Sequence, residues 1–273
     1  MHLGDKNPRD NDGWTPLRNN LFCTVQDTDA SLNHFLSTNT WKNKKRTAEQ
    51  WSDWAYHGSS SKSVIHHPDL FTEDGRNGPL TYEVELYQGC VRFKRGCKFC
   101  IEPKKGMPIW REEKDILNEI NSAIESGVRN VRLGGATDIY TYRAEGVKDM
   151  EYPIPNPGPI LNILSELRNN EGLEILHVDN ANPSIIAENL EISSEITKGM
   201  VEHLSDGAVL SFGLESADPN VHSMNWLNCN PEQIFTAIRH LNEFGRERGP
   251  RGLPKLWPGL NFIAGLTGET EST

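Results

Sequence analysis

Hydrophobic and polar residues follow two different patterns along this chain, and the change between them falls near residue 80. Residues 1–79 are polar, poor in Val, Ile and Leu, and contain turn-rich stretches such as SSSK and EDGRNGP. Their best helical signal runs from Thr47 to Tyr56 and begins with a capping-box pattern of Thr47 and Gln50. From residue 80 onward, short apolar runs alternate with amphipathic segments. We therefore expect an N-terminal extension over 1–79 and a folded core over 80–273.

The pattern of the core predicts repeated β-α units. Short apolar runs bounded by turn residues are typical of strands, and amphipathic segments with apolar residues three and four positions apart are typical of helices. Strands that alternate with helices indicate a parallel sheet. The expected strands are 80–87, 130–135, 173–180, 208–216 and 259–266.

Each crossover between these strands contains a predicted helix. The first ends near Gly127, the second begins at Pro159, the third has two pieces over 184–190 and 194–204, and the fourth begins at Asn230 and Pro231. The expected buried faces are Ile116, Ile120, Ala123 and Ile124 in the first helix, Ile160, Ile163, Leu164 and Leu167 in the second, and Ile234, Ile238, Leu241 and Phe244 in the fourth.

Composition narrows the class of protein. A chain of 273 residues with 36% hydrophobic residues can bury one large core. Its 28 basic and 38 acidic residues argue against a surface that coats polyanions, although a local basic patch remains possible. The sequence contains no signal-like segment and no apolar run of membrane-spanning length. These features predict a soluble, cytoplasmic protein without a membrane partner.

The cysteines add the first chemical signal. The chain has 5 cysteines, an odd and unevenly placed set that does not suit a disulfide framework. Cys90, Cys97 and Cys100 follow the first expected strand with the spacing C-x6-C-x2-C. Ligands of parallel α/β folds gather at the carboxyl ends of strands. We expect these thiolates to hold a [4Fe-4S] cluster with one open iron.

A structural zinc site is the alternative for the same thiols. Such a site needs four ligands. The candidates for the fourth are His66, His67 and Cys229, and none lies at the spacing found in zinc fingers. This shortfall favours the cluster.

Polar and glycine residues follow the later strands as well. Paired glycines at a strand end let a ligand approach the backbone closely, although they equally often form a turn. The side chains after the third and fourth strands could also be helix caps, above all Asn182 and Asp218. The strand-end groups are Gly134 and Gly135 after the second strand, Asp179, Asn180 and Asn182 after the third, and Ser211, Glu215 and Ser216 after the fourth.

Taken in this order, residues 80–273 resemble the radical S-adenosylmethionine (radical SAM) superfamily. The likeness is greatest to an uncharacterised archaeal-type branch of iron-sulfur oxidoreductases, which pairs a GC…GC-x-F-C-x-E loop with an RLG…DI-x-TY segment. Three positions depart from the common pattern. Six residues separate Cys90 from Cys97 where three are usual, Ala136 stands where Glu is common, and Thr267 replaces a Pro.

The resemblance implies a fold and a set of cofactor contacts. The fold would be an α/β partial (β/α) TIM-like barrel that carries a polar N-terminal extension. The cofactors would be a [4Fe-4S] cluster and S-adenosylmethionine (SAM). The implied cluster ligands are Cys90, Cys97 and Cys100; the implied SAM contacts are Phe99, Gly134, Gly135, Asp179, Asn180, Ser211 and Glu215, with the segment 261–270 near the adenine.

The resemblance also implies a reaction and a partner. The reaction would be reductive cleavage of SAM to a 5′-deoxyadenosyl radical that attacks an unknown substrate. The partner would be a low-potential electron donor such as flavodoxin or ferredoxin, and a nucleic-acid substrate is possible but not indicated by charge. A family barrel has six strands, so five expected strands suggest that the sequence stops before the barrel closes.

Two other functions stay open. A tRNA or protein methylthiotransferase would share this core but would need further cysteines for a second cluster, and Cys23 and Cys229 do not supply three. A non-enzymatic iron-sulfur or zinc binding module is the other alternative.

Some residues have a weaker chemical signal. His66 and His67 are expected in a surface turn, and Trp51 and Trp54 on a docking face. Substrate contacts are conceivable for three residues beyond the glycine pair: Asp138, Tyr140 and Tyr142. The basic residues around the cysteines are expected to favour a reduced cluster and to attract an acidic donor; they are Arg92, Lys94, Arg95, Lys98, Lys104 and Lys105.

Overall fold

The structure is a computed structural model that describes residues 48–59, 81–271 and 273. It divides into two compact units, one of Met1–Tyr82 with Lys114–Arg129, the other of Glu83–Glu113 with Asn130–Thr273. Since most of the first 80 residues lie outside the described part, the boundary at 79/80 stays a prediction.

The first unit contains helix α3 (Ala48–Ser59) and nearly all of helix α6 (Glu113–Glu125). The helix predicted from Thr47 is confirmed from Ala48 onward, and Thr47 itself lies outside the described residues. All four residues of the predicted face of α6 are buried. The turn after α6 takes a positive φ of 112° at Gly127, whose N–H donates to the Ile124 carbonyl at 3.0 Å, so the predicted end of this helix is confirmed.

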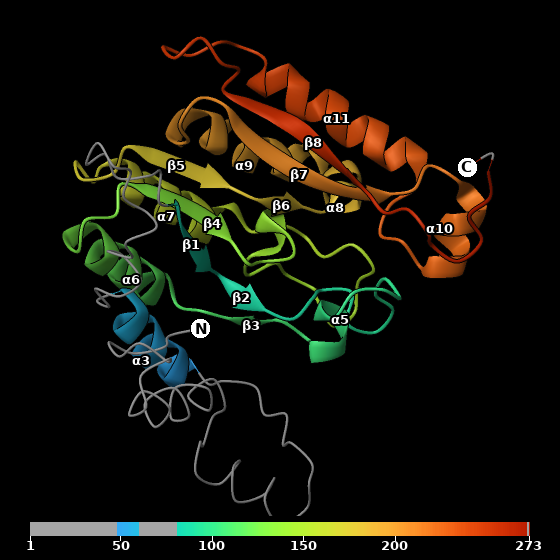
Figure 1. Cartoon of the computed structure of the whole chain (residues 1–273), viewed down its shortest axis with the longest axis horizontal. Helices are drawn as coiled ribbons and strands as arrows, with labels where there is room; N and C mark the ends of the chain where they lie inside the picture. The colour runs from blue at the N-terminus through green and yellow to red at the C-terminus, as the bar shows by residue number, and fades with distance from the viewer. Residues whose placement is uncertain (1–47, 60–80, 272) are drawn as a thin grey trace, which may run out of the picture. The chain divides into compact units, whose positions relative to one another are not determined.

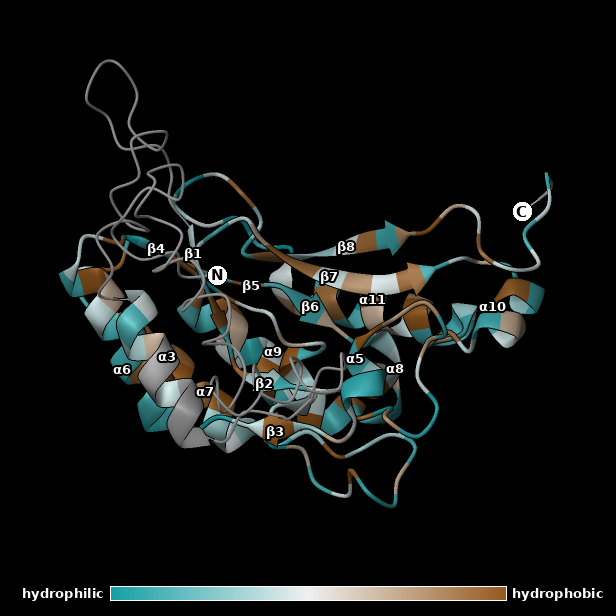
Figure 2. Ribbon diagram, turned by 60° about the horizontal axis from the view of Figure 1, so that its bottom comes forward, coloured by the Kyte–Doolittle hydropathy of each residue, from teal (hydrophilic) through white to brown (hydrophobic). Residues whose placement is uncertain are grey.

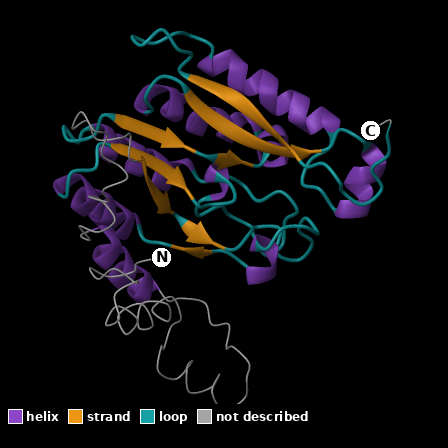
Figure 3. Ribbon diagram, in the orientation of Figure 1, coloured by secondary structure: helices purple, strands orange, loops and turns teal. Residues whose placement is uncertain are grey.

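Two three-stranded sheets form the frame of the second unit (Figure 3). The first has the order β1 (Thr81–Glu85), β4 (Asn130–Gly134), β5 (Ile175–Val178), and β4 and β5 are parallel. The second has the order β6 (Asn180–Ala181), β7 (Ala208–Glu215), β8 (Leu256–Phe262), all parallel. The Ser211 N–H donates to the Asp179 carbonyl at 2.8 Å and so links β7 to the residue between β5 and β6.

The parallel strands follow the predicted order, but three boundaries are wrong. The run 80–87 is two strands, because after Glu85 the chain leaves the parallel sheet and β2 (Tyr87–Gln88) pairs antiparallel with β3 (Ile109–Trp110). The run 173–180 is likewise divided at Asp179 between the two sheets. The last strand begins at Leu256 and ends at Phe262, not over 259–266. The start was missed because proline is unusual within a strand. Pro258 is tolerated here because β8 is an edge strand.

Most crossover helices of the second unit begin at prolines. Proline suits this position because an N–H in the first turn of a helix has no partner within the helix, so nothing is lost when it is absent. The crossover helices are α7 (Pro157–Arg168), α8 (Pro183–Glu188), α9 (Leu190–His203, the exception), α10 (Pro219–Asn225) and α11 (Pro231–Gly245), besides the short α5 (Glu102–Lys105) and the 3₁₀ turn η2 (Ile139–Thr141). α7 starts two residues before the predicted Pro159, and α10 was not predicted at all. No helix in the described part of the chain is long and apolar enough to cross a membrane.

The core of this unit lies where helices meet the strands. α11 runs along β8 and also packs on α8 and α9, while α7 packs on α9 (Figure 1). In Figure 2, α11 carries bands of hydrophobic and hydrophilic residues. Its Ile234 and Leu241 are buried as predicted, whereas Ile238 and Phe244 are only half-buried and Ala237 and His240 take the inner positions. The strands are therefore supported by packed helices, which hold their carboxyl ends in position.

Candidate cofactor site

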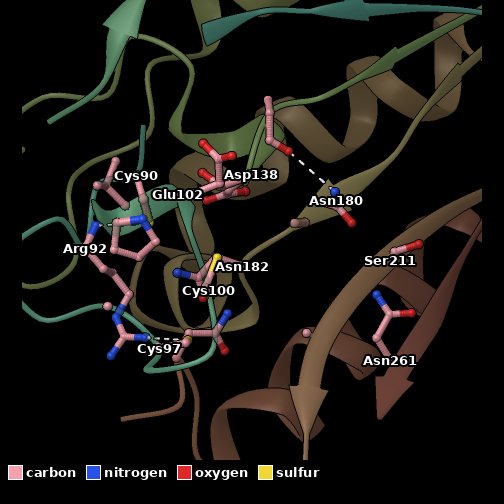
Figure 4. A pocket seen from close by; sticks show the side chains of 18 of the residues that line it. Cys90, Arg92, Cys97, Cys100, Glu102, Asp138, Asn180, Asn182, Ser211 and Asn261 are labelled. Carbon is pink, nitrogen blue, oxygen red and sulfur yellow. Dashed lines mark hydrogen bonds between the residues drawn. The ribbon is translucent and has the colours of Figure 1, made fainter. Parts of the chain in front are cut away.

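A cavity of about 350 Å³ lies within the second unit at the carboxyl ends of its strands (Figure 4). Ligand pockets typically have volumes of about 300–1,000 Å³. Of the cofactor contacts predicted from the sequence, all but Gly134 line it: Cys90, Cys97, Phe99, Cys100, Gly135, Asp179, Asn180, Ser211 and Glu215. Residues from four separate strand ends thus meet around one space.

The three cysteines are brought together by a loop of two turns. The Phe93 N–H donates to the Cys90 carbonyl at 3.0 Å, and the Cys100 N–H donates to the Cys97 carbonyl at 3.1 Å. Gly96 is required between the turns, because a Cβ there would lie 2.0 Å from the Pro103 side chain. All three thiols are free and partly buried. The loop therefore presents three available thiols to the cavity.

Burial works against ionisation of two of these thiols. It raises the pKa of Cys90 to about 11, and it raises the pKa of Cys97 as well. Arg92 offsets part of this effect at both positions, through its charge and through hydrogen bonds to sulfur. A cationic metal centre would stabilise the thiolates much more strongly, because metal ligation displaces the proton.

Arg92 makes several contacts that join the loop to a distant part of the chain. Its backbone N–H donates to Cys90 Sγ at 3.3 Å, and its Nη1 donates to Cys97 Sγ at 3.4 Å (Figure 4). The same guanidinium donates to the carbonyls of Trp226 at 3.2 Å and Leu227 at 3.3 Å. These carbonyls follow the end of α10.

The end of β4 supplies a glycine turn and a buried acid. Gly135 has a φ of 68°, a conformation that favours glycine, and lines the cavity. Gly134 instead packs on β1, where a Cβ would lie 2.4 Å from Glu83 Oε1. Asp138 is only 2% exposed and also lines the cavity. Its Oδ1 accepts from the Tyr140 N–H at 3.0 Å, whereas Oδ2 has no hydrogen-bond partner among the described residues. Burial raises the pKa of Asp138 to about 7.

Polar side chains from the ends of β5, β6 and β7 form the opposite wall. Asn180 Nδ2 lies 3.5 Å from the Ala136 carbonyl and 3.4 Å from Asp179 Oδ2, and Asn180 is paired in register with Ser211. Burial raises the pKa of Asp179 and of Glu215, although Arg132 opposes the rise at Asp179. Two partly desolvated carboxyls facing one cavity suit a ligand that carries positive charge.

Glu215 is held in a strained backbone conformation. It is not a glycine, yet its φ is 65°, and it follows an irregularity in the pairing of β7 with β8 at Gly213. Its carbonyl accepts from the Ile263 N–H at 3.0 Å. Strain of this kind and bulges are concentrated at functional sites because they aim a side chain that a regular strand would not.

Several residues considered from the sequence have other positions. Tyr140 and Tyr142 are fully buried and do not line the cavity; their hydroxyl groups pair with Thr197 and with the Arg111 carbonyl. The alternative of helix caps is confirmed for Asn182 and Asp218, which cap α8 and α10, although Asn182 also lines the cavity.

The remaining candidates either do not line the cavity or lie outside the described residues. Cys229 is buried, and its thiol donates to the Gly213 carbonyl at 3.6 Å. Thr267 is exposed, and its carbonyl accepts from Asn225 Nδ2 at 2.8 Å. Cys23, His66, His67 and the side chains of Trp51 and Trp54 lie outside the described part.

The cavity wall also contains polar residues that sequence reasoning missed. Glu83 lies within β1 and Asn261 within β8, where an inward direction cannot be read from a short mixed run. Glu102 lies two residues after Cys100, and its Oε1 pairs with Lys105 Nζ at 2.5 Å. Its position close to Cys100 was the only feature of the sequence that could have indicated that Glu102 lines the cavity. Asn228 in the connection after α10 completes this group.

Comparison with known proteins identifies the family. A sequence model of the Radical SAM superfamily matches residues 84–273. An uncharacterized protein of Methanocaldococcus jannaschii is 37% identical over 254 residues, which cover 90% of this chain and 45% of that protein. An uncharacterized protein of Archaeoglobus fulgidus is 37% identical over 80% of this chain and 39% of its own length.

A relative with a described activity lies further away. A tRNA-2-methylthio-N(6)-dimethylallyladenosine synthase of Geobacter sulfurreducens is 30% identical over 74% of this chain and 40% of its own length. The chain thus spans less than half the length of each of these relatives.

The cysteine loop fits the iron-sulfur cluster that this superfamily uses. Among the described residues, no three His, Cys, Asp or Glu side chains are arranged to hold a single metal ion. In a [4Fe-4S] cluster each thiolate binds a different iron, so the sulfurs need not converge on one point. Three free thiols on one cavity, with two N–H groups directed at their sulfurs, are a suitable donor set.

The opposite wall fits SAM, the second cofactor of the superfamily. SAM carries a sulfonium and an ammonium group, and both would stabilise the partly buried carboxylates of Asp179 and Glu215. At the end of β4, Asp138 also lines the cavity, and its buried Oδ2 has no hydrogen-bond partner among the described residues. Parallel strands in the order of a partial TIM-like barrel, a cavity at their carboxyl ends and a superfamily match over residues 84–273 agree, and this chain belongs to the Radical SAM superfamily.

Proposed function

We propose that this chain is the SAM-cleaving core of a radical SAM enzyme, with Cys90, Cys97 and Cys100 as the ligands of its [4Fe-4S] cluster. The observation that supports this most directly is that all three free thiols line one cavity with the polar residues of the later strand ends. When bound, the cluster supplies an electron for the reductive cleavage of SAM to methionine and a 5′-deoxyadenosyl radical.

The chain's own residues would bind and orient the cofactor. Asp179 and Glu215 provide negative charge, while Asn180 and Ser211 provide neutral hydrogen-bonding groups on adjacent strands. Phe99 lines the cavity with its side chain 46% exposed, so its ring has an open face with which to cover a bound ligand. Rigid strands hold these groups in position, which is the protein's contribution when a cofactor carries the chemistry.

The electron donor and the substrate belong to the same proposal. Superfamily members need a reductant, and we assign this role to a small acidic protein of the flavodoxin or ferredoxin type, since Lys94, Arg95 and Lys98 are exposed beside the cysteines. Methylthiolation of tRNA is the second candidate reaction, and the likeness to the Geobacter sulfurreducens synthase favours it. The reaction on substrate is otherwise open.

Anaerobic reconstitution tests the cluster assignment. The protein should take up about four irons per chain. Replacing Cys90, Cys97 or Cys100 by Ala should abolish this uptake, while Cys229→Ala should retain it, because Cys229 is buried and is not one of the residues that line the cavity. Dithionite-reduced protein should then release 5′-deoxyadenosine from SAM. Stoichiometric zinc without iron uptake, or equal iron content in all four variants, would contradict the assignment.

A further inference from the structure

Arg92 is a side chain of the cysteine loop that contacts both a cysteine sulfur and the end of α10. The loop and the end of α10 are more than 130 residues apart in sequence, yet the Arg92 guanidinium reaches the carbonyls of both Trp226 and Leu227. A second tether lies close by, where the Lys98 N–H donates to the Asn225 carbonyl at 3.0 Å. The loop is thus fixed at two points against the segment 225–227.

The segment that receives Arg92 is itself well anchored. Trp226 takes a left-handed conformation with a φ of 54°, which turns the chain at the end of α10. The Leu227 N–H donates to the His222 carbonyl at 3.2 Å, and Asn225 Nδ2 donates to the carbonyls of Val221 and Thr267, both at 2.8 Å. Carbonyls at a helix end carry partial negative charge and favour a cation.

The same guanidinium also lies against a cysteine. Nη1 contacts Cys97 Sγ at 3.4 Å, while the backbone N–H of Arg92 is directed at Cys90 Sγ at 3.3 Å. Only an arginine can make this arrangement, because its planar fork offers five donors in fixed directions, whereas lysine offers a point charge.

We propose that Arg92 is a positioning residue that fixes Cys97 relative to the end of α10 and places a permanent positive charge beside the cluster, so that it governs both cluster retention and reduction potential. This inference rests on the proposed function. Charge near a cluster and hydrogen bonds to its sulfurs both set its potential, and a nearby cation favours the reduced, more negative state. The tethers reduce the freedom of the loop, which slows loss of the cluster.

The test compares Arg92→Gln and Arg92→Lys with Lys104→Gln. Lys104 is a matched control because it is an exposed cation four positions after Cys100 and has the same charge. The measurements are iron content after reconstitution, the rate of iron loss to a chelator, the midpoint potential from an EPR-monitored redox titration, and the melting temperature of the metal-free protein.

Arg92→Gln should move the midpoint potential to a more negative value and speed iron loss severalfold. Arg92→Lys should have a midpoint potential close to that of the wild type but should lose iron faster. Lysine keeps the positive charge but lacks the planar guanidinium that makes the three hydrogen bonds. Lys104→Gln should match the wild type in both. If Arg92→Gln takes up no iron while its melting temperature is unchanged, the positioning role is supported. If it does not fold, Arg92→Lys decides through its rate of iron loss.

Three results would overturn the inference. The first is a midpoint potential and a rate of iron loss in Arg92→Gln that equal those of the wild type. The second, if the Gln variant does not fold, is a wild-type rate of iron loss in Arg92→Lys. The third is a shift of the midpoint potential in Lys104→Gln as large as that in Arg92→Gln. All of these require a wild-type protein that holds the cluster. Absence of iron from the wild type would instead overturn the proposed function, and this inference with it.

Discussion

At the scale of single residues, Asp138 is the most unusual acid of the site. It is 2% exposed, and burial raises its pKa from 3.8 to about 7, an effect that the nearby N–H groups of Asn182 and Tyr140 only partly offset. A carboxyl of this kind is half protonated near neutral pH, so it can either accept or donate a hydrogen bond toward the cavity. The cost of keeping it ionised falls on the folded state.

We expect Asp138→Asn to stabilise the protein at about pH 8 and to change its stability little at about pH 4. The folded-state pKa lies above the unfolded one, so the wild type loses stability as pH rises from about 4 through about 7. One pKa unit corresponds to about 1.4 kcal/mol, which makes about 4 kcal/mol the upper limit of the gain. Urea unfolding across this pH range measures it.

Asp218→Asn provides a control of opposite sign. Asp218 is half-buried and caps α10, and the hydrogen bond from the Asn220 N–H lowers its pKa. Its contribution to stability is therefore present above about pH 4 and is lost below, so the Asn variant should be the less stable one at neutral pH. A gain at about pH 8 from both substitutions would show that the effect is not specific to the buried carboxyl.

At the scale of elements, the structure divides the basic residues of the cysteine loop into two groups. Arg92 contacts sulfur, whereas Lys94 donates to the Lys148 carbonyl and Arg95 stacks on the Trp226 ring with 5.4 Å between its guanidinium carbon and the ring centroid. Lys94 and Arg95 are both exposed. These two cations are therefore placed to meet a partner and not to hold the cluster.

Changing Lys94 and Arg95 together to Gln is expected to slow reduction by an acidic donor protein several-fold at low ionic strength and to flatten its dependence on salt. Charges at the rim of an interface act mainly on association rate, and salt screens them. Stopped-flow reduction by flavodoxin at increasing salt measures this. The paired control is Lys198→Gln with Arg239→Gln, two cations that likewise stack on aromatic rings but lie on α9 and α11. Equal slowing by both pairs would rule out a docking role.

Helix α11 offers an independent test of its sequence signal. Asn230 and Gln233 form a complete capping box, with Asn230 Oδ1 accepting from the Gln233 N–H at 2.9 Å and Gln233 Oε1 accepting from the Asn230 N–H at 3.0 Å. Asn230→Ala should lower the free energy of unfolding by about 1 kcal/mol, and Asn230→Ser should restore most of it. A loss of the same size in the Ser variant would mean that Asn230 acts other than as a cap. Chemical denaturation measures both.

At the scale of the whole molecule, β8 is an edge strand of its sheet within the described part of the chain. Three large apolar side chains lie on it, Trp257 at 45%, Leu260 at 41% and Phe262 at 63% exposure. Edge strands of this composition pair with other chains. We expect a polypeptide of residues 1–273 to self-associate through β8 at micromolar concentration.

Phe262→Lys should raise the monomer fraction, because a charge on the edge opposes pairing with a second strand. Light scattering coupled to size-exclusion chromatography measures it over a dilution series. Phe235→Lys is the control, since Phe235 is 61% exposed on α11 and not on the sheet edge. If both variants dissociate the protein alike, general hydrophobicity and not the edge drives association.

Local signals in the sequence were sufficient for the order of the main parallel strands and of most crossover helices, but not for α10 or for the antiparallel pair β2 and β3. Faces at helical spacing, such as Ile160 to Leu167 in α7, and starts such as Asn230 with Pro231 are confirmed because both depend on neighbours within a few residues. The thiol cluster was equally visible, since Cys90, Cys97 and Cys100 stand within one loop. We searched for cofactor contacts at the carboxyl ends of the predicted strands, and nine of the ten predicted contacts line one cavity.

Tertiary structure alone decided which residues complete that cavity and how the strands are shared between sheets. The break at Leu86, the division at Asp179 and the early start of β8 at Leu256 all depend on partner strands that are distant in sequence. In the sequence, Arg92 was one of six basic residues around the cysteines, and it became distinct only through its hydrogen bonds to the carbonyls of Trp226 and Leu227. Nothing in the sequence indicated that the pKa of Asp138 is raised, because this shift comes from burial in the folded protein. Spacing determines what a residue's near neighbours are, whereas burial and long-range hydrogen bonds exist only once the chain has folded.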